Sequence, residues 1–448
     1  MKVTAADNIE GIYPMQVASI AHSGIDLSRY LPEFRRHLRH IAEWWKSHAV
    51  DTKNGGFLGE VSVTCNPVPH ADKSIVLNAR ILWFFSEISL LMQDDPEVDA
   101  SNIEEYRQLA TRAFDYLTAK FHDPVSGGAF WSLDYTGKLK EGKKQTYAQA
   151  FCIYAYANYY RLTGDAVALD LALSYFRLIE RHCVDRKLGG YLEAVTREWQ
   201  PVSDYRLSDK DLNAPKTMNN HLHVLEAYTL LYRVVPTEEV ALAMKSSIDW
   251  FCEKIYNRES GHLRLFLQDD WRDVSASYSY GHDIEGSWLL AEALEVLGDF
   301  SYREKYQPIV EALGRSCMEE GVGYLGKVLD TFDFNAQCRH LDSEWWVQAE
   351  ALVGFLNMWQ MTGDPRFKTA FEKVWKFIKN HQIDWEHGEW LYYASLDRLK
   401  EHQGYKLGFW KGPYHNGRAM MEVLRRLGDI AALTKTQRSE QKRNATTS

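Results

Sequence analysis

A short segment in the second half of the chain carries the residue types of an acid–base site. The segment YGHDIEGSW, residues 280–288, places a glycine, a histidine and two acids at the start of an apolar helical pattern. The first turn of a helix stabilises negative charge, and His282 and Glu285, three residues apart, share a face. The acids Asp283 and Glu285 could equally be ordinary caps set against the helix dipole. The residues at the starts of the other helices distinguish between these two interpretations, an acid–base site and a helix cap.

The overall composition narrows the possible partners. The chain has 448 residues, a formal net charge of −9 and no basic tract before its short tail, which argues against a nucleic-acid partner. No apolar run approaches the roughly 20 residues that a membrane-spanning helix needs, so we expect no membrane partner. The 15 tryptophans and 25 tyrosines suit a ligand with apolar faces, such as a sugar, although large helical cores also use them.

Cysteine usage and the N-terminus predict the compartment. The six cysteines show no CxxC or CxH spacing, as expected of reduced thiols in a reducing compartment. The N-terminal residues contain no continuous apolar stretch, so a secretory signal is not expected. These features predict a cytoplasmic protein, and we expect a monomer or a weak homo-oligomer.

Six near-equal units repeat along the chain. Each contains a glycine turn, and the first glycines of successive turns are 72, 62, 72, 62 and 65 residues apart. The turns begin at Gly55, Gly127, Gly189, Gly261, Gly323 and Gly388. Such a period indicates one supersecondary unit repeated six times.

Each unit is predicted to hold two helices of different character. The helix before each turn keeps one apolar stripe among charged residues, as an outer helix does. The helix after each turn is apolar nearly all round and is predicted to be buried. The outer helices span 27–49, 103–121, 166–183, 238–256, 302–319 and 365–381. The inner helices span 76–92, 146–162, 217–233, 283–297, 344–361 and 414–427. Gly-Asp pairs at 164–165, 298–299, 363–364 and 428–429 are predicted to end one helix and cap the next.

Twelve alternating helices close most economically into an all-α toroid, an (α/α)6 barrel of six outer and six inner helices. A short β-hairpin is expected at one end of each pair. An open solenoid would use the same pattern, but short connections and the lack of distinct terminal caps favour closure. We therefore predict an N-terminal extension over 1–25, one barrel domain over 26–430 and a disordered polar tail over 431–448.

Closure would bring the starts of the inner helices to one axial cavity. The residues expected there are Arg80, Tyr147, Asn219, His223, His282, Glu285, Trp346, Glu350 and His415, with Trp131 and Trp410 on adjacent loops. Asn219 and His223 share a helix face, whereas His221 points about 200° away from His223. For Arg80 the alternative is a buried structural ion pair, and for Trp131 a place in the core.

Two histidines on opposite sides of one cavity suit proton transfer near neutral pH, since the ordinary pKa of histidine is about 6.5. An arginine and a third histidine could stabilise an oxyanion, and tryptophans could stack on sugar faces. This set suits removal of a proton next to a carbonyl group and its return through an enediolate. Glycoside hydrolysis fits less well, because it needs two carboxyls flanking one bond, a pair that Glu285 and Glu350 could in principle form.

Five long segments resemble those of a known family. They are LNARILWFFSE (77–87), MNNHLHVLEAYTLLYRV (218–234), YGHDIEGSWLL (280–290), WWVQAEALVGFLN (345–357) and FWKGPYHNGRAMMEVL (409–424). They are similar to the corresponding segments of cellobiose 2-epimerases, within the N-acyl-D-glucosamine 2-epimerase superfamily. The resemblance implies an (α/α)6 barrel that interconverts glucose and mannose configurations at C2 of a reducing-end sugar, with no metal or other cofactor.

The resemblance also implies roles for individual residues. His282 and His415 resemble the two acid–base residues that exchange the C2 proton, while Arg80 and His223 resemble groups that stabilise the enediolate. The residues expected to bind the sugar are Tyr147, Asn219, Glu285, Trp346, Trp410, Glu350 and Trp131. Glu285 is further expected to orient His282 or its neighbour.

The sequence is compatible with more than one substrate and more than one reaction class. The favoured substrate is a β-1,4-linked disaccharide such as cellobiose or lactose, and the alternative is a mannose 2-epimerase that acts on free mannose or glucose. The second sugar is expected to contact loops 203–216 and 333–343. Further alternatives are an aldose–ketose isomerase, a metal-dependent isomerase using His223, His282 and Glu285, and a non-catalytic sugar-binding toroid.

Overall fold

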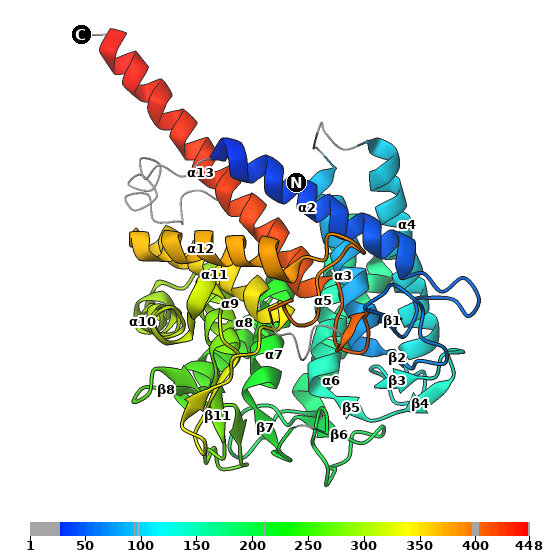
Figure 1. Cartoon of the computed structure of the whole chain (residues 1–448). Helices are drawn as coiled ribbons and strands as arrows, with labels where there is room; N and C mark the ends of the chain where they lie inside the picture. The colour runs from blue at the N-terminus through cyan, green and yellow to red at the C-terminus, as the bar shows by residue number, and fades with distance from the viewer. Residues whose placement is uncertain (1–26, 94, 96–98, 210, 397–402, 447–448) are drawn as a thin grey trace.

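The computed structural model describes residues 27–446 except 94, 96–98, 210 and 397–402, with side chains described over 28–432. The predicted N-terminal extension, 1–25, lies outside the described residues. Within them, 12 α-helices alternate between an outer and an inner ring (Figure 1). The outer helices are α2 (Leu27–His48), α4 (Ala100–Tyr116), α6 (Ala166–His182), α8 (Glu238–Trp250), α10 (Phe300–Ser316) and α12 (Pro365–Phe377). The inner helices are α3 (Ile75–Met92), α5 (Thr146–Thr163), α7 (Met218–Val234), α9 (Tyr280–Leu297), α11 (Trp345–Thr362) and α13 (Tyr414–Thr446).

Helix ends follow the predicted signals except in two respects. Asp165, Asp299 and Asp364 cap α6, α10 and α12 directly after glycines in left-handed conformation. Four outer helices, however, end in a π-helical turn that the sequence pattern does not distinguish from α-helix. These turns are η2 (Leu117–Phe121), η3 (Phe251–Ile255), η4 (Cys317–Gly321) and η6 (Ile378–Gln382).

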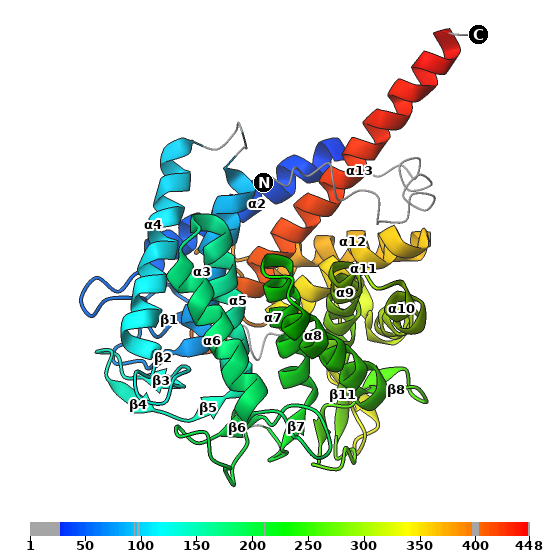
Figure 2. The ribbon, with the colours of Figure 1, turned by 180° about the vertical axis from the view of Figure 1, so that it is seen from behind.

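The last inner helix also runs past its predicted end. α13 passes through Gly428 and continues to Thr446, away from the body of the barrel (Figures 1 and 2). The predicted stop at 428–429 is therefore wrong. One glycine costs a helix only about 1 kcal/mol, and the residues after it include many strong helix formers and no proline. The backbone of the polar tail, expected to be disordered, is thus helical up to Thr446, while the boundary at residue 431 stays a prediction.

Short antiparallel strands join the units at one end of the barrel. They are β1 (Val61–Ser62), β2 (Lys73–Ser74), β3 (Ser132–Leu133), β4 (Leu139–Glu141), β5 (Lys144–Gln145), β6 (Ala194–Val195), β7 (Lys216–Thr217), β8 (Tyr256–Asn257), β9 (His262–Leu263), β10 (Phe266–Leu267), β11 (Ser277–Ser279), β12 (Thr331–Asp333), β13 (Cys338–Arg339) and β14 (Tyr405–Leu407). A hairpin was predicted in every unit, but among the described residues only three units pair their own strands, as β3–β4, β8–β9 and β12–β13. Pairs β2–β3, β5–β6, β7–β10 and β11–β12 instead connect consecutive units.

The first and last units meet and close the ring. Strand β14 of the sixth unit pairs with β1 of the first. Helix α13 packs against both α2 and α3, and the three lie together in Figures 1 and 2. An open solenoid would leave these elements apart, so the predicted (α/α)6 barrel is confirmed.

Buried lysine–aspartate pairs hold the glycine turns against the inner helices. In four units an aspartate four residues before the first glycine pairs with a lysine in the strand before the inner helix. The pairs are Asp51–Lys73 (2.8 Å), Asp123–Lys144 (3.0 Å), Asp185–Lys216 (2.8 Å) and Asp384–Lys406 (2.7 Å). Each lysine is at most 1% exposed, so the pairs fix where each inner helix begins.

The inner helices form the core. Helix α3 is the one described helix that is long and apolar enough to cross a membrane by length and composition, but 89% of it is buried inside the protein. Helix α3 is therefore a core helix of the barrel.

Candidate active site

The starts of the inner helices surround a cavity of about 630 Å3. Nine of the eleven predicted site residues line it: Arg80, Tyr147, Asn219, His223, His282, Glu285, Trp346, Trp410 and His415. Glu350 and Trp131 do not line this cavity. Glu350 lies behind His415, and Trp131 packs against Phe409 and Trp410, so the structure places Trp131 in the core.

One position recurs around the cavity. The sixth residue of each of the first five inner helices is Arg80, Phe151, His223, Glu285 or Glu350, and the fifth residue of α13 is Arg418. Neighbours in this set touch: the Arg80 guanidinium lies 4.6 Å from the ring centre of Phe151, and Phe151 lies 4.9 Å from His223. The helix starts thus arrange charged and aromatic groups around the barrel axis.

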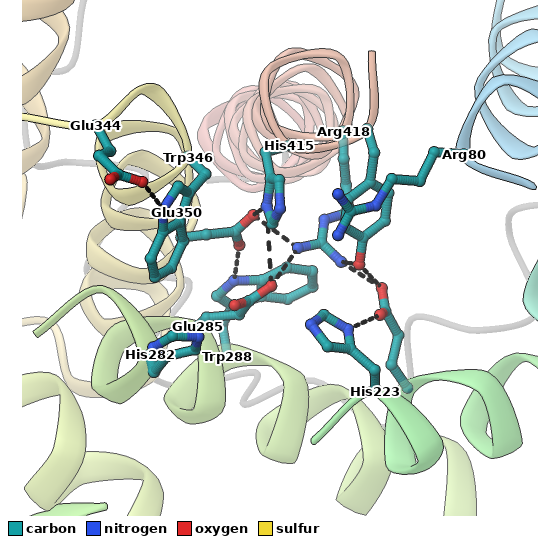
Figure 3. A network of polar contacts seen from close by, with 12 residues as sticks. Arg80, His223, His282, Glu285, Trp288, Glu344, Trp346, Glu350, His415 and Arg418 are labelled. Atoms are coloured by element: carbon teal, nitrogen blue, oxygen red, sulfur yellow. Dashed lines mark hydrogen bonds and ion pairs between the residues drawn. The ribbon is translucent and has the colours of Figure 1, made fainter. Parts of the chain in front are cut away.

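Arg418 is the main site residue that the sequence analysis missed. It is 2% exposed and donates to Glu226 through Nη1, to Glu285 at 2.9 Å and to Glu350 at 2.7 Å through Nη2. Figure 3 shows Arg418 and His415 facing Glu285 and His282 across one space. The spacing of His415 and Arg418, three residues apart and therefore on one helix face, is the sequence signal that could have found it.

His415 is oriented by a carboxylate. Its Nδ1 lies 2.6 Å from Oε1 of Glu350. The same oxygen accepts a hydrogen bond from Arg418, and Oε2 accepts one from Trp288 Nε1 at 2.9 Å. Burial raises the pKa of Glu350, whereas the charge of Arg418 and the hydrogen bonds from Arg418 and Trp288 favour its ionised form. An ionised carboxylate beside Nδ1 of His415 holds the imidazole proton there. Burial and the charges of Arg80 and Arg418 lower the pKa of His415 well below its ordinary value. Nε2 is therefore left as a free base.

His223 has the same kind of partner. Its Nδ1 lies 2.8 Å from Oε2 of Glu226, whose other oxygen accepts from Tyr414 and Arg418. Burial would raise the pKa of Glu226, but the charge of Arg418 lowers this pKa to about 2. Burial lowers the pKa of His223 more than Glu226 raises it, so His223 is neutral at pH 7.

His282 differs, because its partner is a hydroxyl. Nδ1 lies 2.9 Å from Oγ of Ser279, the residue that caps α9 and accepts the His282 backbone N–H. Desolvation, together with the charge of His223, lowers the pKa of His282 to about 3. Glu285 was expected to orient His282 or its neighbour. Its carboxylate instead accepts a hydrogen bond from Arg418 and lies 4.0 Å from Nδ1 of His415. The imidazole of His282 is thus neutral and held by its own helix cap.

Arg80 is a buried cation with neutral partners. Nη1 donates to the backbone oxygen of Trp410 at 2.6 Å and Nη2 to the hydroxyl of Tyr147 at 2.8 Å. No described carboxylate forms an ion pair with it, so the alternative of a structural ion pair is wrong. Aromatic faces of Phe151 and Tyr414 cover the guanidinium. An uncompensated positive charge in a cavity wall is suited to an oxyanion.

Glu285, Glu350 and His415 form the one described cluster whose ligand atoms are close enough to hold a metal. Arg418 already donates hydrogen bonds to both carboxylates, so its guanidinium supplies the positive charge that a metal ion would bring to this cluster. Burial and the charge of Glu350 raise the pKa of Glu285 well above its ordinary value. The alternative of a metal held by His223, His282 and Glu285 names a different set from the one that the structure brings together. The same arrangement contradicts a glycosidase pair, because Glu350 lies behind His415.

Aromatic residues form the walls of the cavity. The ring of Trp346 lies 4.6 Å from His282 and 5.8 Å from His415, and its Nε1 donates to Glu344 at 2.8 Å. The loop 203–216 contributes Leu207, Ser208, Asp209 and Asp211 to the lining. The segment 333–343 contributes none. A loop of the sixth unit supplies Tyr392, Tyr393, Gln403, Gly404 and Tyr405 instead.

Known proteins share both the sequence and the fold of this chain. The chain is 42% identical over 386 residues to a cellobiose 2-epimerase of Bacteroides fragilis, covering 86% of this chain and 95% of the relative. The solved cellobiose 2-epimerase of Bacillus thermoamylovorans superposes with a TM-score of 0.81 at 35% identity, covering 89% of this chain and all of that one. A D-mannose isomerase of Marinomonas mediterranea is 25% identical over 384 residues, covering 79% of this chain and 87% of the relative.

A family model confirms the relationship. The model of N-acylglucosamine 2-epimerase matches residues 56–415, which include every cavity-lining histidine. The chain therefore belongs to the N-acylglucosamine 2-epimerase family.

Proposed function

We propose that this protein is an isomerase that inverts C2 of the reducing-end sugar of a β-1,4-linked disaccharide. The observation that carries the proposal is the placement of two imidazoles, His282 from α9 and His415 from α13, in the wall of one cavity. Relatives named cellobiose 2-epimerase, at 42% identity and below, support the reaction and the disaccharide.

The mechanism follows from these groups. One imidazole takes the C2 proton of the open-chain sugar through Nε2, and the C–H electrons move to form an enediolate across C1 and C2. Arg80, with no carboxylate partner among the described residues, and His223 stabilise the negative oxygen. The other imidazole enters the step as an imidazolium, protonated at both nitrogens, and donates its Nε2 proton to the opposite face of C2. The configuration inverts, and each histidine ends in the protonation state that the other had.

The cavity supports a substrate larger than one sugar. Its volume of about 630 Å3 lies within the roughly 300–1,000 Å3 of sites that take small organic ligands. The side of the cavity lined by Trp410 and the tyrosines at 392, 393 and 405 adds wall area besides that of the catalytic histidines. We assign the second sugar to this side, and free mannose or glucose is the competing substrate.

We further propose that catalysis needs no metal, because Arg418 supplies a positive charge at the carboxylate cluster. The six cysteines are unpaired, which supports a reducing compartment such as the cytoplasm. A monomer or weak homo-oligomer is the proposed state in solution.

Product analysis tests the proposal. Purified protein is incubated with cellobiose, lactose or mannose, each with and without a chelator, and products are separated by chromatography. We expect mannose-ended disaccharides from the first two, unaffected by chelation. Conversion of free mannose alone would replace the substrate, and ketose as the main product would identify an aldose–ketose isomerase. Loss of activity with chelator would support the metal-dependent alternative. If no sugar gives a product, the protein would be a sugar-binding toroid without catalytic activity.

A further inference from the structure

A second cavity adjoins the first behind His282. It has a volume of about 250 Å3 and shares five lining residues with the main cavity: Leu207, Asp211, Asn219, His282 and Trp346. Leu212, 44% exposed, belongs to its lining, so this chamber reaches the surface. A water needs on the order of 10–15 Å3 and two to four polar partners, so the chamber has room for several waters.

Glu193 is the acid in this chamber. It is 1% exposed and lines the chamber. Its Oε2 accepts from the hydroxyl of Thr217, which in turn accepts the backbone N–H of Asn220 as the cap of α7. Its Oε1 is buried and has no hydrogen-bond partner in the described chain. Because Thr217 uses its hydrogen on Oε2, a proton on Glu193 is carried by Oε1.

The cap of α9 leads from the chamber to the catalytic ring. Ser279 lines the chamber, and its Oγ lies 2.9 Å from Nδ1 of His282. A hydroxyl can accept one proton and release another, so Ser279 can pass a proton between Nδ1 and water. His415 has no such route, because its Nδ1 is occupied by Glu350, which Arg418 and Trp288 also bind.

The proposed reaction creates a need for this route. After each turnover, the histidine that gave the proton is neutral and the one that received it is protonated. A second substrate molecule of the same configuration can react only when both have returned to their starting states. Since His282 lines both cavities, one of its ring nitrogens can serve the substrate while the other exchanges with solvent.

We propose that Glu193 is a proton-relay residue that exchanges protons between His282 and solvent through water in this chamber. The inference rests on the proposed epimerase function. In one direction, Nδ1 of His282 releases a proton to Ser279, Ser279 releases its own to chamber water, and the water protonates Oε1 of a Glu193 carboxylate. Glu193 then releases this proton towards the surface at Leu212. No bond other than those to hydrogen changes.

The electrostatics of Glu193 suit this role. Burial, reinforced by Asp211 and opposed by Thr217 and Lys143, raises its pKa to about 8. Tyr205, Arg206, Asp330 and His282 are the other charged or titratable groups in the chamber lining. A group with a pKa near the working pH holds and releases a proton with similar ease.

Comparing one turnover with many tests the relay. Glu193→Gln keeps the size and the Thr217 contact but cannot carry a proton. We expect steady-state kcat to fall roughly tenfold, less than the about 10²–10⁴-fold of a direct acid–base group. The rate of a single turnover, with enzyme in excess over cellobiose, should stay at the wild-type value. Added imidazole buffer should restore the steady-state rate of E193Q without affecting wild type.

A matched control is Glu180→Gln. Glu180 is also held by hydroxyls, those of Tyr191 and Tyr228, but it lines neither cavity. E180Q should change neither rate. If E193Q does not fold, Glu193→Asp, which keeps the acid but shortens it, should show an intermediate steady-state rate and a normal single turnover.

Two outcomes would overturn the relay. Equal slowing of E193Q in single and multiple turnovers would make Glu193 a structural residue, and an unchanged steady-state rate would mean that protons return by another path. A wild-type protein that forms no epimer would instead remove the proposed function itself.

Discussion

The two imidazoles on either side of the cavity differ in their partners. His415 is held by the carboxylate of Glu350, whereas His282 is held by the hydroxyl of Ser279. A carboxylate partner makes an imidazole a stronger base, so the two proton transfers are not equivalent. Each histidine nevertheless serves only one face of the sugar.

Single substitutions of these histidines should have complementary effects. His282→Ala and His415→Ala are each expected to lower epimerisation by about 10²–10⁴-fold without unfolding the protein. Each variant should still exchange the C2 hydrogen of one epimer with solvent, and the two variants should act on opposite epimers, as followed by proton NMR. His40→Ala, on an exposed residue of α2, is the control. Substantial epimerisation by either variant would remove that histidine from the pair.

Arg418 balances carboxylates from three inner helices. Its contacts with Glu226, Glu285 and Glu350 mean that one side chain of α13 compensates charges on α7, α9 and α11. Removing one member of a buried charge network leaves the others without compensation.

Arg418→Met should therefore destabilise the protein by about 3–5 kcal/mol, measured by urea unfolding at pH 7. The exposed Arg366, paired with Asp364, gives the comparison, and Arg366→Met should have little effect. A loss from Arg418→Met no greater than that from Arg366→Met would show that the three carboxyls are compensated by other means.

Four of the inner helices share a hydrogen bond that ties the start of the helix to the preceding glycine turn. The fourth residue of α5, α7, α9 and α11 accepts a backbone N–H from that turn: Gln149 from Ala129, His221 from Tyr191, Asp283 from Leu263 and Gln348 from Val328. His221 thus points away from the cavity, as its spacing from His223 predicted. The tie sets the rotation of each helix and so aims its sixth residue at the axis.

His221 makes this tie sensitive to acid. Its pKa is lowered to about 4 by burial, while the unfolded chain has a value near 6.5. Between these values the unfolded state binds one more proton, so this residue's contribution to stability falls as pH falls. His221→Gln, which copies Gln149 and Gln348, should lower the slope of unfolding free energy against pH by about 1.4 kcal/mol per unit between pH 4 and 6.5. Urea titrations at several pH values measure it, and parallel curves for the two proteins would contradict it.

Helix spacing predicts what lies on one helix, but contacts between helices depend on the closed ring. Helix spacing predicted that two pairs of residues share a helix face, His282 with Glu285 and Asn219 with His223. Both pairs lie in the cavity wall, as expected. The spacing could not predict that Glu285 turns to Arg418, because that contact joins residues 133 positions apart. The π-helical turns were missed for a related reason, since they differ from α-helix in hydrogen bonding and not in apolar pattern.

At the scale of the whole molecule, closure brings His415 to the site. Helix α13 carries His415 and Arg418 and reaches the ring through β14–β1 pairing and packing on α2. The six-fold period of the glycine turns predicted this architecture. The end of α13 was not predictable, because residues after 430 have helical propensity but no apolar stripe to pack.

Truncation separates the two parts of α13. A protein that ends at residue 432 keeps every cavity-lining residue and the buried Ile430, so its kcat and thermal midpoint should equal those of the full chain. A protein that ends at residue 412 loses α13 and should be unfolded by circular dichroism. Loss of activity in the longer truncated protein would give the tail a role in the site.

The most direct test of the account is proton NMR of wild-type protein with cellobiose in deuterated water. Two histidines that work on opposite faces must return a solvent-derived hydrogen, so the mannose-ended product should carry deuterium at C2. Product without deuterium would contradict the two-base mechanism, and no product would contradict the assignment of the site.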